Sequence, residues 1–213
     1  MVFEEKYSRK KPFLVEFAGP PKSGKTTIID RIKYELPYTF SIIREVSIDA
    51  PVEKKKTLKY MEWAANELIN KLIFTEELIK KQIVLIDCGI LSQLSLLEAF
   101  KSSGKIKDSE MNFYEQIRNH LLLNLKRENL IFYVSMTPQK EVDRIRTYNF
   151  PKGAIMNERF LRIFNQSYED LVKQIKGKIR IFNIDGSFDP DINAKNVTKL
   201  IIKHYKKSLR KLR

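Results

Sequence analysis

Short apolar runs alternate along the chain with segments of helical periodicity, which is the pattern of a parallel α/β sheet. The apolar runs are rich in β-branched and aromatic residues, as expected for strands that are covered on both faces. We therefore predict five strands, at residues 12–18, 40–46, 83–87, 130–135 and 179–184.

The segments that connect these strands carry apolar residues at spacings of three and four, which predicts helices. The predicted helices span residues 25–35, 54–80, 90–100, 109–126, 138–146, 157–176 and 194–209. Turn residues at 149–153 interrupt this pattern, so we interpret about 138–165 as a lid whose tip lies there. The length fits one large core, so residues 1–213 are expected to form a single domain, with a basic C-terminal helix over about 194–213.

Net charge leaves two interpretations of the surface open. The chain carries 40 Lys and Arg against 26 Asp and Glu, a formal charge of +14. Such a field attracts polyanions, so it suits either a solvated surface with a phosphorylated small substrate or a surface that binds nucleic acid. The basic residues are densest near both ends of the sequence, where solvated charge is the usual explanation.

Targeting signals and cysteine chemistry narrow the class of protein. The single cysteine, Cys88, excludes an intramolecular disulfide and a thiolate-based zinc site. No run reaches the roughly 18 apolar residues that a membrane span needs, and the N-terminal residues lack a signal-peptide core. We therefore expect a cytoplasmic protein with no membrane partner.

Residues 19–26 read Gly-Pro-Pro-Lys-Ser-Gly-Lys-Thr, a full match to the phosphate-binding pattern G-x-x-x-x-G-K-[ST]. A predicted strand precedes the match and a predicted helix follows it, which makes a chance glycine-rich turn the weaker alternative. Gly19 and Gly24 would allow the backbone N–H groups to converge on phosphate oxygens, and the helix start would add the positive end of its dipole.

We expect this loop to bind a purine nucleoside triphosphate, ATP, together with Mg²⁺. Lys25 would bridge the β- and γ-phosphates, and Thr26 would place its hydroxyl on Mg²⁺. Lys22 would add positive charge at the loop tip. The full set of predicted nucleotide-binding residues is Gly19, Pro20, Pro21, Lys22, Ser23, Gly24, Lys25, Thr26 and Thr27.

Two acidic residues follow predicted strands and are candidates for chemistry. Asp87 ends the third strand, where an acid can hold Mg²⁺ through water, although it is also placed to cap the helix that begins at Ile90. Glu45 lies near the end of the second strand, beside Arg44. It is a candidate to take the proton from a substrate hydroxyl or to position that substrate, and a surface ion pair is an equal alternative.

Arginines around the predicted lid are candidates for phosphate contacts, because a guanidinium group donates two bonds at once. Arg144 and Arg146 are two residues apart on a helix and so do not share a face. One of them would reach the transferred phosphate, and the other would contact adenine or the lid. Arg159 and Arg162 are three apart and share a face, but a solvated basic helix accounts for at least two of these four.

Aromatic and sulfur side chains fit structural roles better than chemical ones. Tyr60 and Trp63 are expected in the core or the wall of a pocket, with stacking of Trp63 on a base as the alternative. Cys88 is expected to be a small buried side chain and not a reactive thiol.

Taken together, these residues resemble the P-loop deoxynucleoside kinase and thymidylate kinase group, and the bacterial and archaeal ATP-binding proteins allied to it. The resemblance runs from Phe13 to about Ile202. It is carried by the P-loop, by residues 83–100, by residues 153–168 with the Arg-x-Arg pair before them, and by the pair at 44–45.

The resemblance implies a P-loop NTPase three-layer sandwich, with a five-stranded parallel sheet in the order 2-3-1-4-5 and a helical lid. It implies ATP and Mg²⁺ as cofactors, a small phosphate acceptor as the second substrate, and a possible homodimer. The catalytic residues that it implies are Lys25, Glu45, Asp87, Arg144 and Arg146, with Thr26 and Asp87 on the metal.

One residue departs from the family pattern. Cys88 stands where the family has an arginine after the strand-end acid, and a cysteine supplies neither charge nor a two-pronged donor. Another cation such as Arg44, Lys54 or Arg159 replaces it, or the acceptor differs, or transfer is lost. The first hypothesis is ATP-dependent phosphoryl transfer to a nucleoside or nucleotide. The alternatives are a nucleic-acid-associated NTPase or polynucleotide 5′-kinase, and a non-catalytic ATP-binding protein.

Overall fold

The computed structural model of the protein describes residues 11–50, 57–79, 82–147, 157–175 and 177–210. Five parallel strands form one sheet in the order β2-β3-β1-β4-β5, which confirms the predicted order. The strands are β1 (Phe13–Ala18), β2 (Phe40–Ile43), β3 (Ile83–Asp87), β4 (Leu130–Ser135) and β5 (Ile181–Asp185). The prediction for β2 was three residues too long, because the chain turns at Arg44 and Glu45 into a short 3-10 helix, η1 (Val46–Asp49).

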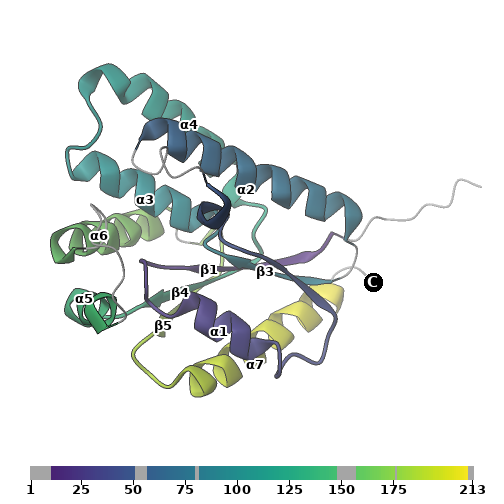
Figure 1. Ribbon diagram of the computed structural model, residues 1–213. Helices are drawn as coiled ribbons and strands as arrows, with labels where there is room; N and C mark the ends of the chain where they lie inside the picture. The colour runs from purple at the N-terminus through teal and green to yellow at the C-terminus, as the bar shows by residue number, and fades with distance from the viewer. Residues whose placement is uncertain (1–10, 51–56, 80–81, 148–156, 176, 211–213) are drawn as a thin grey trace, which may run out of the picture.

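Helices cover both faces of the sheet and make three layers (Figure 1). Their bounds are α1 (Lys25–Ile32), α2 (Leu58–Leu78), α3 (Ile90–Ser102), α4 (Met111–Leu125), α5 (Pro138–Thr147), α6 (Glu158–Ile175) and α7 (Pro190–Arg210), with a 3-10 turn, η3 (Asp108–Glu110), before α4. Each predicted helix is present, with ends shifted by a few residues. The predicted lid tip at 149–153 lies outside the described residues. Across the described ranges, no helix combines the length and apolarity needed to cross a lipid bilayer.

The central strand β1 divides the core into two apolar layers because its side chains alternate between the faces of the sheet. Phe13, Val15 and Phe17 face the layer that α1 and α7 cover. Leu14 and Ala18 face the larger layer under α2, α3, α4 and α6. Glu16 shares this second face and is completely buried there.

Because all five strands run in the same direction, their carboxyl ends meet at one edge of the sheet. In open α/β sheets this edge carries the ligand crevice. Here it carries a cavity of about 740 Å³ that is lined by the loop after β1, the turn after β3, the segment after β2 and the ends of α5 and β5. The fold therefore brings together residues that are far apart along the chain.

Candidate active site

The loop between β1 and α1 has the backbone conformation that a phosphate cradle needs. Gly19 and Gly24 have φ values of 140° and 107°, and Lys22 has a φ value of 65°, all in the region that favours glycine. A Cβ atom at Gly19 would collide with the backbone carbonyl oxygen of Val134 in β4. Gly24 is the N-cap of α1, and no side chain from the described part of the chain caps that helix. The first N–H groups of α1 therefore face the cavity in a position to bind an anion.

The Lys25 ammonium group lies inside this loop and is almost completely buried. It donates hydrogen bonds to the carbonyl oxygens of Gly19 at 3.0 Å and Pro20 at 2.7 Å, which leaves one of its three protons for a ligand. Burial lowers the pKa of Lys25, but nearby carboxyl groups, Glu45 and Asp87 among them, act against burial, and the pKa is raised. The side chain is therefore a fixed positive charge at the floor of the cavity.

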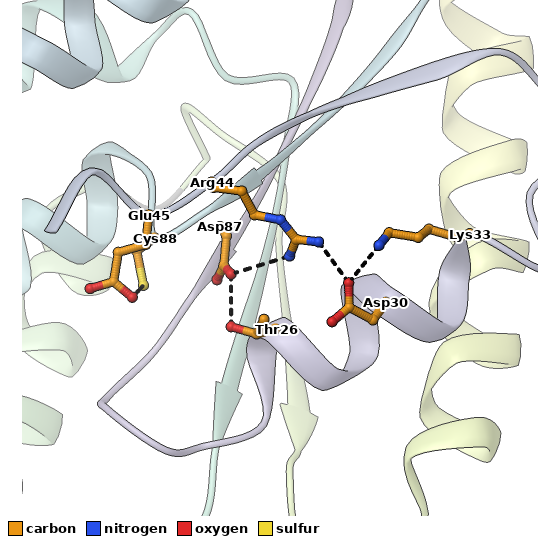
Figure 2. A network of polar contacts seen from close by, with 7 residues as sticks. All are labelled: Thr26, Asp30, Lys33, Arg44, Glu45, Asp87 and Cys88. Atoms are coloured by element: carbon orange, nitrogen blue, oxygen red, sulfur yellow. Dashed lines mark hydrogen bonds and ion pairs between the residues drawn. The ribbon is translucent and has the colours of Figure 1, made fainter. Parts of the chain in front are cut away.

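Thr26 and Asp87 meet beside the loop, as Figure 2 shows. The Thr26 hydroxyl donates to Asp87 Oδ2 at 2.7 Å. The Arg44 guanidinium lies 4.0 Å from the same oxygen and 2.7 Å from Asp30 on α1, which also pairs with Lys33. Burial raises the pKa of Asp87, and Lys25 and Thr26 partly oppose this effect.

The oxygen atoms of Thr26 and Asp87 fit a magnesium ion bound together with a nucleotide. Asp87 Oδ1 is buried and takes no hydrogen bond from the described residues. Hydroxyl and carboxylate oxygens are the hard ligands that Mg²⁺ prefers, and this ion usually takes phosphate and water oxygens as well. Within the described ranges no three acidic, histidine or cysteine side chains form a metal cluster by themselves, so the remaining ligands would come from the triphosphate and water.

The alternative role of Asp87 as a helix cap is not what the structure shows. Gly89 is the N-cap of α3, and the first N–H groups of α3 donate to the side chains of Glu16 and Glu128. Sequence reasoning missed both of these acids. The signal that could have identified Glu16 is its charge within a strand predicted to be buried on both faces.

Glu45 lies in the cavity and is half-buried. Its Oε1 accepts a hydrogen bond from the Ser47 hydroxyl, and its Oε2 accepts one from the Cys88 thiol at 3.6 Å. Burial and then Glu45 raise the pKa of Tyr60 to about 12, so its phenol stays protonated beside the carboxylate. Glu45 thus lies among hydroxyl and thiol groups, and the predicted surface ion pair is absent from its described contacts.

Cys88 is buried and confirms the prediction of a small buried side chain. It adopts a φ value of 60°, and its N–H donates to the carbonyl oxygen of Phe17 at 3.1 Å. Burial raises the pKa of the thiol well above its usual value. The position at which the family arginine was expected is therefore uncharged.

The part of the cavity away from the phosphate loop has a mostly apolar wall that the sequence did not identify. Its additional residues are Ser92, Gln93 and Leu96 of α3, Phe100 at the far end of that helix, and Phe164 of α6. These residues come from two helices that are adjacent only in the folded chain, which explains why no local motif marked them. The cavity is thus divided into a cationic part at the loop and a largely neutral part beyond Glu45.

The two predicted lid arginines, Arg144 and Arg146, lie on different faces of α5, as their spacing of two residues predicts. Arg144 donates to the carbonyl oxygens of Lys22 at 3.4 Å and Gly186 at 3.0 Å and lines the cavity. The side chain of Arg146 is 72% exposed and lies 3.9 Å from Asp143. Arg146 is therefore not brought together with the other candidate residues. Arg162 pairs with Glu158 on the exposed side of α6.

The other predicted nucleotide-binding residues either line the cavity or stabilise the phosphate loop. Pro21, Lys22 and Thr27 line the cavity. Pro20 accepts a bond from Lys25, and Ser23 is completely buried with its hydroxyl unpartnered among the described residues. Outside this set, Trp63 packs against the core and stacks on Tyr60, which favours the structural interpretation of that aromatic pair.

Comparison with known structures supports the fold. The deoxyadenosine kinase of M. mycoides with products dCMP and a flexible dCDP bound has a TM-score of 0.74 and 16% sequence identity, over 90% of this chain and 100% of that chain. The same enzyme with bound dATP gives 0.72 and 18%, over 88% and 98%. Thymidylate kinase from Candida albicans gives 0.60 and 14%, over 92% and 94%.

Sequence comparison supplies the family. No curated protein matches the chain. The family model described as deoxynucleoside kinase matches residues 17–210, which includes the phosphate loop, both strand-end acids and the α5–α6 region. This match covers most of the chain and agrees with the P-loop, the strand order and the cavity. The protein is a P-loop kinase that belongs to the deoxynucleoside kinase family.

Proposed function

We propose that the protein transfers the γ-phosphoryl group of ATP to a hydroxyl group of an uncharged nucleoside. The observation that carries this proposal is the distribution of charge in the cavity. Its cationic lining residues, Lys22, Lys25 and Arg144, all lie around the phosphate loop. The other part carries the carboxylate of Glu45 and, among the described lining residues, no lysine or arginine.

This distribution favours a neutral acceptor over a nucleoside monophosphate. A monophosphate carries up to two negative charges at neutral pH and would lie near Glu45 without a compensating cation. Like charges at that distance in a partly buried site repel strongly. The thiol of Cys88 donates to Glu45 but carries no charge. The loss of the family arginine is thus compatible with catalysis when the acceptor has no phosphate.

The phosphate loop provides the donor site. Backbone N–H groups of the loop and of the α1 start would bind the β- and γ-phosphates of ATP, with Lys25 between them and Arg144 above. Thr26 and Asp87 would hold Mg²⁺, which neutralises phosphate charge when it is bound. The bound dATP of the M. mycoides enzyme supports a purine triphosphate as a ligand of this fold.

Glu45 is the candidate base at the acceptor site. Its carboxylate lies on the cavity wall, and the Ser47 hydroxyl and the Cys88 thiol hold it in place. We expect it to accept the proton of the nucleoside hydroxyl as that oxygen attacks the γ-phosphorus in line with the leaving ADP oxygen. Ser92 and Gln93 supply hydrogen-bonding groups for a base or sugar, and Leu96 and Phe164 supply apolar surface.

The test is a panel of acceptors with ATP labelled on its γ-phosphate. Deoxynucleosides and ribonucleosides, the corresponding monophosphates, and an oligonucleotide with a free 5′-hydroxyl are incubated separately with the protein and Mg²⁺. We expect label in nucleoside monophosphate products alone. Transfer to monophosphates but not to nucleosides would overturn the proposal, transfer to the oligonucleotide would favour a polynucleotide kinase, and binding without transfer would favour an ATP-binding protein.

A matched pair of variants tests the base. Glu45→Gln keeps the shape of the side chain and should lower kcat by about 10²–10⁴ while ATP affinity stays unchanged. Glu67→Gln is the control, because Glu67 pairs with Lys71 on the surface of α2, outside the cavity lining. Equal effects of the two substitutions would remove Glu45 from the proposed mechanism.

A further inference from the structure

Two acidic side chains from distant parts of the chain are buried behind the wall of the acceptor site. Glu16 of β1 is completely buried, and Glu128, in the turn between α4 and β4, is 3% exposed. Asn129 holds that turn against β1, because its side chain accepts from the N–H of Leu14 and its own N–H donates to the Leu14 carbonyl. Burying two carboxyl groups costs free energy unless hydrogen bonds compensate for the loss of water. The hydrogen-bond partners of Glu16 and Glu128 therefore indicate the role of the two side chains.

The hydrogen bonds of both groups end on the first turn of α3. Glu16 Oε2 accepts from the N–H of Leu91 at 3.0 Å, and Oε1 accepts from the N–H and the hydroxyl of Ser92 at 2.9 and 3.0 Å. Glu128 Oε1 accepts from the N–H of Ile90 at 3.0 Å. The two side chains therefore cap three successive N–H groups that the helix cannot satisfy by itself.

The two acids differ in how many of their oxygen atoms accept hydrogen bonds. Both oxygens of Glu16 accept, which is the pattern of an ionised carboxylate at the positive end of a helix. In Glu128 only Oε1 accepts a hydrogen bond from the described residues, and Oε2 is buried and takes none, so Oε2 is the atom left to carry a proton. Burial and then Glu16 raise the pKa of Glu128 well above its usual value, which favours this protonated form. The pair thus carries one negative charge and one proton.

Gly89, which lies between Asp87 and the first turn of α3, makes room for this pair of acids. A Cβ atom at Gly89 would lie 2.7 Å from both Glu128 Oε1 and Glu16 Cδ, although the backbone angles of Gly89 suit any residue. The first turn of α3 then presents Ser92 and Gln93 to the cavity. The segment that contains Asp87 at one end and Gln93 at the other is anchored from behind by these two acids.

We propose that Glu16 and Glu128 are positioning residues that act as a pair, with Glu16 as the ionised acceptor and Glu128 as the neutral donor, to fix the α3 start against the bound nucleoside. The link to the nucleoside rests on the proposed function, whereas the assignment of the proton does not. Neither acid touches the cavity, so their effect is transmitted through Ser92 and Gln93.

A pair of isosteric substitutions separates the two roles. Glu16→Gln places an NH₂ group opposite an N–H donor of Leu91 or Ser92, because an amide has only one oxygen. Glu128→Gln keeps an oxygen for Ile90 and a donor for Glu16, so it imitates the protonated acid. A purely space-filling role for the pair predicts the same small effect for both substitutions.

The first measurement needs no substrate. Hydrogen exchange of the amides of Ile90, Leu91 and Ser92 is followed by NMR in the full chain. Glu16→Gln should accelerate exchange about tenfold to hundredfold, the size expected for one broken bond to a buried charged group. Glu128→Gln should leave exchange within about twofold of wild type. Equal acceleration in both variants, or none in either, would overturn the assignment of the proton.

The second measurement concerns catalysis. Glu16→Gln should raise the KM for the nucleoside more than the KM for ATP, while Glu128→Gln should leave both unchanged. If the wild-type chain transfers no phosphate to nucleosides, the proposed function fails, but the exchange experiment still decides the role of the pair. A nucleoside KM that is unaffected in a folded Glu16→Gln variant with accelerated exchange would overturn the positioning role.

Should Glu16→Gln fail to fold, the pH dependence of exchange in the wild type replaces it. Ionisation of Glu128 would set two negative charges against each other, with Cys88 from the β3–α3 turn and Tyr168 from α6 as the other titratable groups near Glu16. Exchange at Ile90 should therefore rise more steeply with pH than the intrinsic exchange rate does, and this excess should vanish in Glu128→Gln. The same excess in both proteins would contradict the proposal.

Discussion

Helices α1 and α3 begin in the same way, yet their first turns do different things. Each follows a buried parallel strand at the same edge of the sheet, each has a glycine as its N-cap, and neither has an acidic residue in its own first turn. At α1 none of the described side chains caps the N–H groups, which face the cavity. At α3 Glu16 and Glu128 cap them from behind.

The comparison shows that a helix start at the crevice is not by itself a phosphate site. The dipole and the unsatisfied N–H groups attract an anion in both places. At α3 the protein supplies its own anion, and the helix becomes a rigid wall. At α1 the anion would have to come from a ligand, and we expect Lys25 to add the charge that fixes its position. The following predictions test this difference.

The largest effect is expected from removing the ammonium group at the α1 start. Lys25→Ala should lower phosphoryl transfer by about a thousandfold or more and abolish measurable ATP affinity, because charge at the transferred group is lost. The melting temperature without ligand should change little, since the hydrogen bonds of Lys25 to described residues all end on its own loop. Kinetics and calorimetry measure this effect, with Lys33→Ala, on the surface near the end of α1, as the control. Unchanged ATP affinity in Lys25→Ala would exclude the loop as the donor site.

A substitution at the α3 N-cap should act on stability. Gly89→Ala introduces a Cβ atom against two carboxyl groups and should lower the free energy of unfolding by about 1–3 kcal/mol. Urea denaturation measures this loss. In the double variant Gly89→Ala/Glu128→Ala, truncation of Glu128 makes room for the new Cβ atom. The double variant should therefore lose less stability than the sum of the losses in the two single variants. Strict additivity would mean that the glycine is needed for another reason.

Stability should depend on pH through Glu128 at the capped helix start. The folded-state pKa of Glu128 is raised, so the folded protein binds more protons than the unfolded chain above the ordinary glutamate pKa. This stability contribution is fully present below that ordinary pKa and is lost as the pH rises through the raised one, by up to about 1.4 kcal/mol per pH unit. Denaturation of wild type and Glu128→Gln over pH 5 to 9 should give a flatter curve for the variant. Parallel curves would contradict the protonated state of Glu128.

The smallest effect is expected from an anion alone. Tripolyphosphate should bind at α1 and raise the free energy of unfolding by about 1.4 kcal/mol at ten times its Kd. Thermal denaturation with increasing tripolyphosphate measures this gain. The gain should vanish in Lys25→Ala and persist in Glu128→Gln. Persistence in Lys25→Ala would place the anion elsewhere on this basic protein.

The sequence predicts the parts of this molecule that depend on local patterns. The five strands and the α1 start follow from apolar periodicity and from one eight-residue motif, because both need only neighbouring residues. The order of the strands is not a local pattern, and only the family resemblance implied it. The separation of Arg144 from Arg146 follows from helix geometry. The prediction of Thr26 and Asp87 as magnesium ligands follows from the same motif and from the position of Asp87 at a strand end, and the family resemblance implies the same pair.

The remaining features depend on contacts between distant segments. Nothing near Glu16 indicates that its partners are at 90–92 and 128, and a charge within a strand reads as an interruption of the apolar run. The wall residues Gln93 and Phe164 lie on helices that look like ordinary core helices. The sequence pattern predicts that Glu45 lies within the second strand, because its β-branched neighbours favour a strand over a short 3-10 helix. In the structure this strand ends two residues before Glu45.

The segment from Glu128 to Val134 supports both helix starts, since Glu128 caps α3 and the carbonyl of Val134 packs against Gly19. During synthesis on the ribosome, the phosphate loop and β3 would emerge well before this segment. Neither half of the crevice can reach its final shape until β4 has joined the sheet, so the cationic and the neutral parts of the cavity form together.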